Sequence, residues 1–114
     1  MSQDTVDAKT YIAELVARSR AAQKQIEHYS QEQVDALIRA MVWSVAKPGM
    51  AEEIAQFTID ETQLGNYDGK FLKIQRKTRA TLLDIIHDKS VGVIEEYPER
   101  NIRVLAQPLG VTGA

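Results

Sequence analysis

The sequence contains no cysteine, and this absence excludes several kinds of site at once. Without thiols the chain can form no disulfide, no zinc–thiolate centre and no thiolate nucleophile of its own. It is also poor in other special residues, with three prolines, six glycines and 6% aromatic residues, and no low-complexity tract is visible. The remaining composition, 44% hydrophobic and 26% charged, is typical of a folded globular chain. A length of 114 residues corresponds to one small domain.

Long hydrophobic runs and an excess of positive charge are missing as well. No apolar run approaches the roughly 18 residues that a membrane-spanning helix needs. The first residues, MSQDTVDAK, are acidic and polar, whereas a secretory signal begins with basic and then apolar residues. We therefore expect a cytoplasmic protein with no membrane partner. The formal net charge of −2 lacks the positive excess that binding to a phosphate backbone requires, so nucleic acid is not an expected partner.

Apolar residues recur at helical spacing in the first part of the chain. The first such segment runs from Asp4 to about His28. A second begins after Ser30, which forms an S-x-x-Q capping box with Gln33, and we expect it to end at Pro48-Gly49 because proline cannot continue a helix. Two amphipathic helices are predicted here.

Two more helices are predicted before residue 90. The third begins at Met50 and continues towards Leu64, where we expect Gly65 to close it. Residues 66–69 are predicted to form a turn, and the fourth helix follows it, with an apolar face of Phe71, Ile74, Gln75, Thr78, Leu82, Ile85 and Ile86.

The period changes from helical to alternating after residue 89. SVGVIEEY (90–97) is rich in β-branched residues, PERN (98–101) is typical of a turn, and IRVLAQ (102–107) alternates apolar and polar residues. Pro108 interrupts this pattern, and 109–114 begins a third extended piece. Because a lone two-stranded hairpin is marginally stable, we expect these β segments to join a sheet whose other strands lie outside the 114 residues.

The residues show no recognisable active site. His28 and His87 lack the spacing of metal ligands, so no metal site is expected. The adjacent acidic pairs at 52–53, 60–61 and 95–96 point in different directions on a helix or strand, which favours solubility over general acid–base catalysis. No serine lies in a G-x-S-x-G context, and no catalytic residue is therefore assigned.

Two charged features stand out on the predicted helices. The basic run KFLKIQRKTR, with five cations between Lys70 and Arg79, is either a solvated helix face or an anion-binding patch. Asp35 and Arg39, four residues apart on the second predicted helix, are expected to form a surface ion pair of small energetic value.

The order of the parts resembles that of a known family. Glu61-Thr62 followed by Gly65 is similar to an E-T-x-x-G helix ending, and Pro108-Leu109-Gly110-Val111 is similar to a P-x-G-V entry into a nucleotide-binding strand. In this order they resemble the amino-terminal portion of the aldehyde dehydrogenase superfamily, and most of all its CoA-acylating branch. The resemblance covers essentially the whole chain.

This resemblance implies an α/β enzyme of which the chain is an amino-terminal fragment. It implies a helical segment at 1–90, a β-hairpin of the oligomerisation region at 91–107, and the first strand entry of the NAD(P)-binding domain at 108–114. The full enzyme would oxidise an aldehyde with NAD or NADP, transfer the acyl group to coenzyme A, and form a homo-oligomer through 91–107. Its nucleophilic cysteine and its cofactor-binding residues would follow residue 114, so the fragment alone is expected to be inactive and to hold no cofactor.

Two other functions stay open on the sequence. One is a non-catalytic helical interaction module that docks through its β-hairpin onto the sheet edge of a partner. The other is an anion-binding helical protein that uses the basic run at 70–79, for which binding would be strongly salt-dependent.

Overall fold

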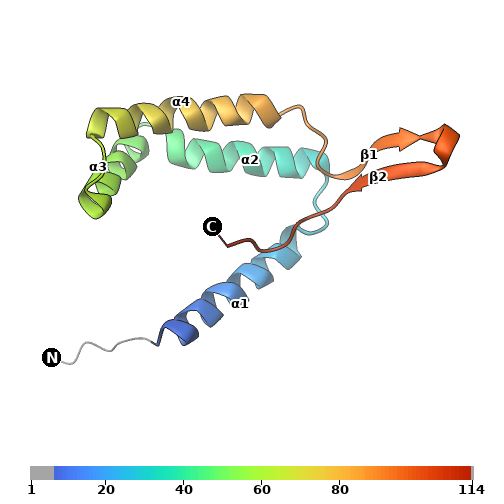
Figure 1. Cartoon of the computed structure of the whole chain (residues 1–114), viewed down its shortest axis with the longest axis horizontal. Coiled ribbons are helices and arrows are strands. Elements are labelled where there is room, and N and C mark those ends of the chain that lie inside the picture. The colour runs from blue at the N-terminus through green and yellow to red at the C-terminus, as the bar shows by residue number, and fades with distance from the viewer. Residues whose placement is uncertain (1–6, 114) are drawn as a thin grey trace. The chain divides into compact units, whose positions relative to one another are not determined.

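A computed structural model describes residues 7–113 of the chain. Four helices precede a two-stranded hairpin, with a single 3-10 turn between its strands (Figure 1). The elements in chain order are α1 (Ala8–Ile26), α2 (Gln31–Ala46), α3 (Met50–Thr62), α4 (Tyr67–Ile85), β1 (Gly92–Tyr97), η1 (Pro98–Arg100) and β2 (Ile102–Ala106). The prediction of four helices followed by a hairpin is confirmed.

The chain divides into two compact units. One, the helical unit, is continuous from Gln31 to Lys89 and contains α2, α3 and α4. The other combines the chain before residue 31 with the chain from Ser90 onwards, and it contains α1 and the hairpin. Each unit is described by itself below.

Helix α1 begins where an aspartate can satisfy its first free backbone donors. The carboxylate of Asp7 accepts hydrogen bonds from the Thr10 backbone N–H at 3.2 Å and from the Thr10 hydroxyl at 3.0 Å. The expected start at Asp4 lies outside the described residues. Along the predicted apolar stripe, Leu15, Val16 and Ile26 are partly covered, whereas Ile12 is exposed.

Helices α2 and α3 are separated where the sequence predicts. Helix α2 ends at Ala46, just before Pro48-Gly49, and α3 begins at Met50. Gly49 adopts a φ of +86°, which glycine reaches without the steric cost of a Cβ atom, and its N–H donates to the Glu52 carboxylate at 2.7 Å. The predicted end of α2 is therefore confirmed, while the Ser30–Gln33 capping box stays a prediction.

The α3–α4 connection corrects two expectations. Helix α3 ends at Thr62, and its C-cap is Gln63 in the left-handed conformation (φ 54°), whereas Gly65 was expected to close the helix. Two hydrogen bonds support this conformation: the Gln63 N–H donates to the Ile59 carbonyl at 2.9 Å, and its side-chain amide donates to the Asp60 carbonyl at 2.8 Å. Gly65 also has a positive φ of 83°, but it lies in the connection beyond the helix end.

The second correction concerns residues 66–69, which are not a free turn. Asn66 is the N-cap of α4, and its side-chain oxygen accepts from the Gly69 N–H at 2.8 Å. A Cβ atom on residue 69 would lie 3.1 Å from that oxygen, so glycine leaves the cap the space it uses. Residues 67–69 thus form the first turn of the helix.

Small side chains allow the three helices of the helical unit to approach one another. Ala46, Ala51 and Ala55 are at most 1% exposed and are the buried apolar residues of the described chain. In Figure 1, α2 and α4 run side by side, and α3 joins them at one end. The Gln75 side-chain amide donates to the Ala46 carbonyl at 3.0 Å, so α4 satisfies a carbonyl that the end of α2 leaves free.

The hairpin is antiparallel and contains one irregularity. Tyr97 pairs with Ile102, Glu96 with Arg103 and Glu95 with Val104, but the register then shifts between Val93 and Glu95. Ile94 is the extra residue of this β-bulge. Residues 108–113 form no regular element, so the expected third strand is not formed in the described chain. Pro108 has no N–H to donate, and the described sheet offers only β1 and β2.

Candidate functional site

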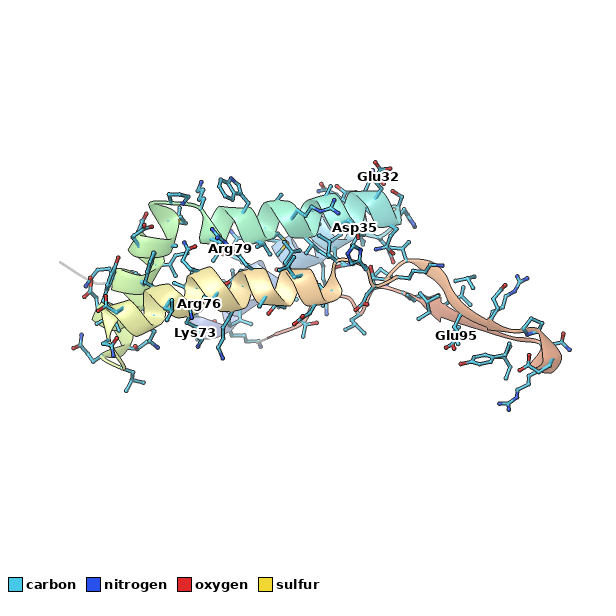
Figure 2. All side chains as sticks on the ribbon, turned by 90° about the horizontal axis from the view of Figure 1, so that it is seen from above. Glu32, Asp35, Lys73, Arg76, Arg79 and Glu95 are labelled. Carbon is cyan, nitrogen blue, oxygen red and sulfur yellow. The ribbon has the colours of Figure 1, made fainter. Side chains whose placement is uncertain are left out.

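The hairpin presents two chemically different faces. Glu96 and Arg103 lie opposite each other on one face and form an ion pair with 2.8 Å between a carboxylate oxygen and the Arg103 Nε. Glu95 lies on the other face, and Figure 2 labels it on the hairpin. The adjacent acidic pair at 95–96 is therefore split between the two faces, as predicted from strand alternation.

Glu95 has its own partner on its face of the hairpin. Tyr97 lies two residues away along β1, and a side-chain hydrogen bond between the two groups raises the pKa of the Tyr97 hydroxyl. The protonated hydroxyl can donate a hydrogen bond to the carboxylate, whereas its deprotonation would place two negative charges side by side. The i, i+2 spacing on a strand is the sequence signal that could have identified this pair.

The bulge decides which apolar residues accompany the ion pair. Because Ile94 is inserted, Val93 pairs with Leu105 on the face that carries Glu96 and Arg103. Val93 is 41% exposed and Leu105 is 56% exposed, so this face is apolar at one end and charged at the other. The bulge was not predicted, because this segment was interpreted only from its content of β-branched residues. Two adjacent apolar residues, Val93 and Ile94, precede two adjacent acidic ones, and this break in strict alternation is the signal that could have identified the bulge.

Both strands have one edge without a partner within the described residues. The sheet contains β1 and β2 alone, so each strand offers the outward-facing backbone groups of its free edge. Neither strand has a buried residue. This combination of open edges and exposed apolar side chains can accept a further strand from another polypeptide.

The tip of the hairpin contains an open hollow lined by Glu96, Pro98, Asn101, Ile102 and Arg103. Its carboxylate is already paired with the guanidinium of Arg103. Apart from this carboxylate, none of the five lining residues carries a side chain that acts as a nucleophile in covalent catalysis.

The other candidate residues from the sequence are not brought together. No group of three or more histidine, aspartate or glutamate residues suited to a metal ion is found in the part of the chain described. Asp35, labelled in Figure 2, accepts a hydrogen bond from the Gln31 side-chain amide at 2.8 Å. It forms no ion pair with Arg39 at the described positions, so that expectation is wrong: a nearer amide takes the carboxylate.

The basic run lies on α4 and has no acidic partner among residues 7–113. Its cations are exposed except for Lys70, which is partly covered, and none lies within ion-pair distance of a carboxylate there. Figure 2 labels Lys73, Arg76 and Arg79 on this helix. Phe71, Ile74, Gln75, Thr78, Leu82 and Ile86 of the predicted apolar face are partly covered, whereas Ile85 is exposed.

The two glycines near the end of the described chain do not form the glycine-rich turn of a dinucleotide-binding site. A dinucleotide cradle needs a glycine-rich turn that leads from a strand into a helix. Gly110 and Gly113 instead lie in an irregular segment with no helix after it in the described chain. None of the helices in the described part combines the length and apolar character needed to cross a bilayer.

Comparison with known proteins adds the relationship that the geometry alone does not reveal. No protein-family model matches the chain. Over 103 residues, 90% of this chain, the sequence is 41% identical to the succinate-semialdehyde dehydrogenase (acetylating) of Clostridium kluyveri. Over the same length it is 36% identical to a sulfoacetaldehyde dehydrogenase of an Acholeplasma species and 35% identical to the sulfoacetaldehyde dehydrogenase (acylating) of Cupriavidus necator.

These matches cover most of this chain but only a small part of each relative. The chain spans 22% of the length of the Clostridium protein and 21% of each of the other two. An aldehyde-alcohol dehydrogenase of Entamoeba histolytica also matches, at 29% identity over 96% of the chain and 13% of its own length. The resemblance predicted from the sequence is thereby confirmed, and the chain is a homologue of the amino-terminal part of the acylating aldehyde dehydrogenases.

Proposed function

We propose that this chain supplies the amino-terminal helices and the assembly hairpin of a cytoplasmic, CoA-acylating aldehyde dehydrogenase. The observation that carries the proposal is the 35–41% identity to acylating succinate-semialdehyde and sulfoacetaldehyde dehydrogenases over 90% of the chain. In such an enzyme an aldehyde is oxidised with NAD or NADP as hydride acceptor, and the acyl group passes to coenzyme A.

The chain's own contribution to this reaction is structural. The nucleophile would be a cysteine, and the sequence contains none. The segment 91–107 acts in subunit assembly, because both edges of its sheet are open within the described chain and four of its large apolar residues are exposed: Val93, Ile94, Ile102 and Leu105. Residues 108–114 lead into the cofactor-binding sheet, where Pro108 separates the two β regions.

A split-enzyme experiment tests this proposal. The Clostridium kluyveri relative is produced without the stretch that this chain matches, and the chain is co-expressed with it. NAD(P)H formation from succinate semialdehyde and coenzyme A is then measured. We expect the truncated relative and the chain to be inactive separately and active together.

A matched pair of variants assigns that activity to the hairpin. Val104→Pro removes a backbone donor from β2 and should abolish the recovery of activity. Val104→Thr keeps the donor and the β-branched shape and should preserve it. Turnover by the 114-residue chain alone, or recovery that is unaffected by Val104→Pro, would contradict the proposal.

A second candidate function is supported by the same open sheet edges. A non-catalytic helical module could dock through its hairpin onto the sheet edge of another protein, because main-chain hydrogen bonds provide affinity in strand addition. Failure to restore activity, together with binding of the wild-type chain but not of Val104→Pro to the inactive truncated relative, would favour this module.

A further inference from the structure

The helical unit carries two exposed stripes of opposite charge with the same spacing. On α4, the cationic stripe consists of Leu72, Arg76, Arg79 and Leu83, which are all exposed. On α3, the acidic stripe consists of Glu53, Phe57 and Asp60, which are exposed as well. Residues at i, i+4 and i+7 lie on one face of a helix, so each stripe is continuous.

The charges of both stripes lack ionic partners within residues 7–113. Neither arginine lies within ion-pair distance of a carboxylate, and neither acidic residue lies within that distance of a cation. Asp60 accepts a hydrogen bond from the Gln56 side-chain amide at 2.8 Å, which leaves its charge uncompensated. Apolar area is exposed beside these charges, since Phe57 is 66% exposed and Leu83 is 71% exposed.

The two stripes cannot meet within one chain. Helix α3 packs through the face that contains Ala51 and Ala55, and the acidic stripe lies on its opposite side. Helix α4 packs through the partly covered face that contains Ile74 and Gln75, and the cationic stripe lies away from that face. Both stripes therefore remain exposed to solvent when α2, α3 and α4 are packed against one another.

We propose that the acidic stripe of one chain docks on the cationic stripe of a second copy. The two stripes can align whether the paired helices run parallel or antiparallel. The α3 stripe has intervals of 4 and then 3 residues, and the α4 stripe contains these intervals in both orders. In each direction one of Arg76 and Arg79 lies opposite Asp60, and the other lies opposite Phe57. The first contact is an ion pair, and the second is a cation–π contact with the aromatic ring.

The second copy is the occupant indicated by charge complementarity within the chain itself. In the same pairings Glu53 lies opposite Leu72 when the helices are parallel and opposite Leu83 when they are antiparallel, so each contact contains one ion pair, and the exposed leucine adds apolar area beside it. The contact is heterologous, so each chain retains one free stripe after pairing, and association continues beyond a dimer as concentration rises. This surface belongs to the helical unit and involves none of the residues of the hairpin.

Charge reversal tests the proposal, with sedimentation of the whole chain at low salt as the readout. The variant Arg76→Glu/Arg79→Glu has two acidic stripes, and the variant Glu53→Arg/Asp60→Arg has two cationic stripes. Each alone should associate at least about tenfold more weakly than the wild type, because like charges then face each other. An equimolar mixture of the two variants should recover the association.

Controls separate this docking from folding and from a general effect of charge. Far-UV circular dichroism should show wild-type helix content for both variants. Arg18→Glu/Arg20→Glu on α1 makes the same change in net charge as Arg76→Glu/Arg79→Glu but lies outside the stripes, and it should leave the association unchanged. A variant that associates as strongly as the wild type, a mixture without recovery, or an equal loss in the α1 control would overturn the proposal.

Discussion

The helical unit and the hairpin show two different ways in which this chain is held together. Three alanines at most 1% exposed lie where α2, α3 and α4 pack, and the Gln75 side chain links α4 to the end of α2. The hairpin has no buried residue, and it is held by its backbone ladder and the Glu96–Arg103 ion pair. A substitution that disrupts packing in the helical unit should therefore cost more stability than one that removes the surface ion pair of the hairpin.

The largest expected effect comes from filling the alanine contact. Ala55→Leu forces three extra carbon atoms into a position that is 0% exposed, and we expect it to lower the free energy of unfolding by about 1–3 kcal/mol. Urea unfolding followed by helix circular dichroism measures this loss. Ala80→Leu, at an exposed position of α4, is the control and should change it by less than about 0.5 kcal/mol. Equal losses would show that the alanine contact is not the core.

A smaller loss is expected at the start of α4. Asn66→Ala removes the acceptor of the Gly69 N–H and should destabilise the helical unit by about 1 kcal/mol, again measured by urea unfolding. Asn66→Asp keeps an oxygen at the same place and should remain within a few tenths of a kcal/mol of the wild type. Similar losses in the two variants would contradict the assignment of Asn66 as the cap.

The hairpin ion pair should contribute still less. The side chains of Arg103 and Glu96 are 71% and 51% exposed, so water and salt screen their attraction. A double-mutant cycle with Glu96→Ala and Arg103→Ala, based on hairpin populations from backbone chemical shifts, should give a coupling of about 0.2–1 kcal/mol. A coupling above the cost of Ala55→Leu would reverse the contrast between the two regions.

The smallest effect is a pH dependence at the start of α1. Hydrogen bonds from the Thr10 side chain and backbone hold the pKa of Asp7 below its usual value of 3.8. Since the folded pKa is depressed, the stabilisation is present above pH 3.8 and is lost as the pH falls through the folded pKa. The Thr10 amide chemical shift should titrate below pH 3.8 in the wild type, and Asp7→Asn should abolish that titration. A titration that persists in Asp7→Asn would contradict this origin.

Much of the element order could be predicted from local pattern, whereas the special backbone positions could not. Helical spacing and Pro48-Gly49 place α2 and α3 correctly, because both signals act within a few residues. Gly65 was expected to close α3, but Gln63 caps it in the left-handed conformation, with support from hydrogen bonds to Ile59 and Asp60. A propensity rule does not include such support.

The candidate site was less predictable than the fold. The sequence predicted that neighbouring acidic residues in a strand separate, which the register of Glu95 and Glu96 confirms. It did not predict that Arg103 is the partner of Glu96, or that Ile94 forms a bulge, because both depend on the register between the two strands.

The sequence by itself determined which segments become helix or strand and to which family the chain is related, since periodicity, caps and motifs are written in neighbouring residues. Tertiary structure alone decided which apolar residues are covered. The small side chains of Ala46, Ala51 and Ala55 are buried while Phe57, Trp43 and Leu83 stay exposed. The physical reason is that a pattern creates an apolar face, but burial requires a second surface that approaches it, and close helix packing favours small residues at the point of contact.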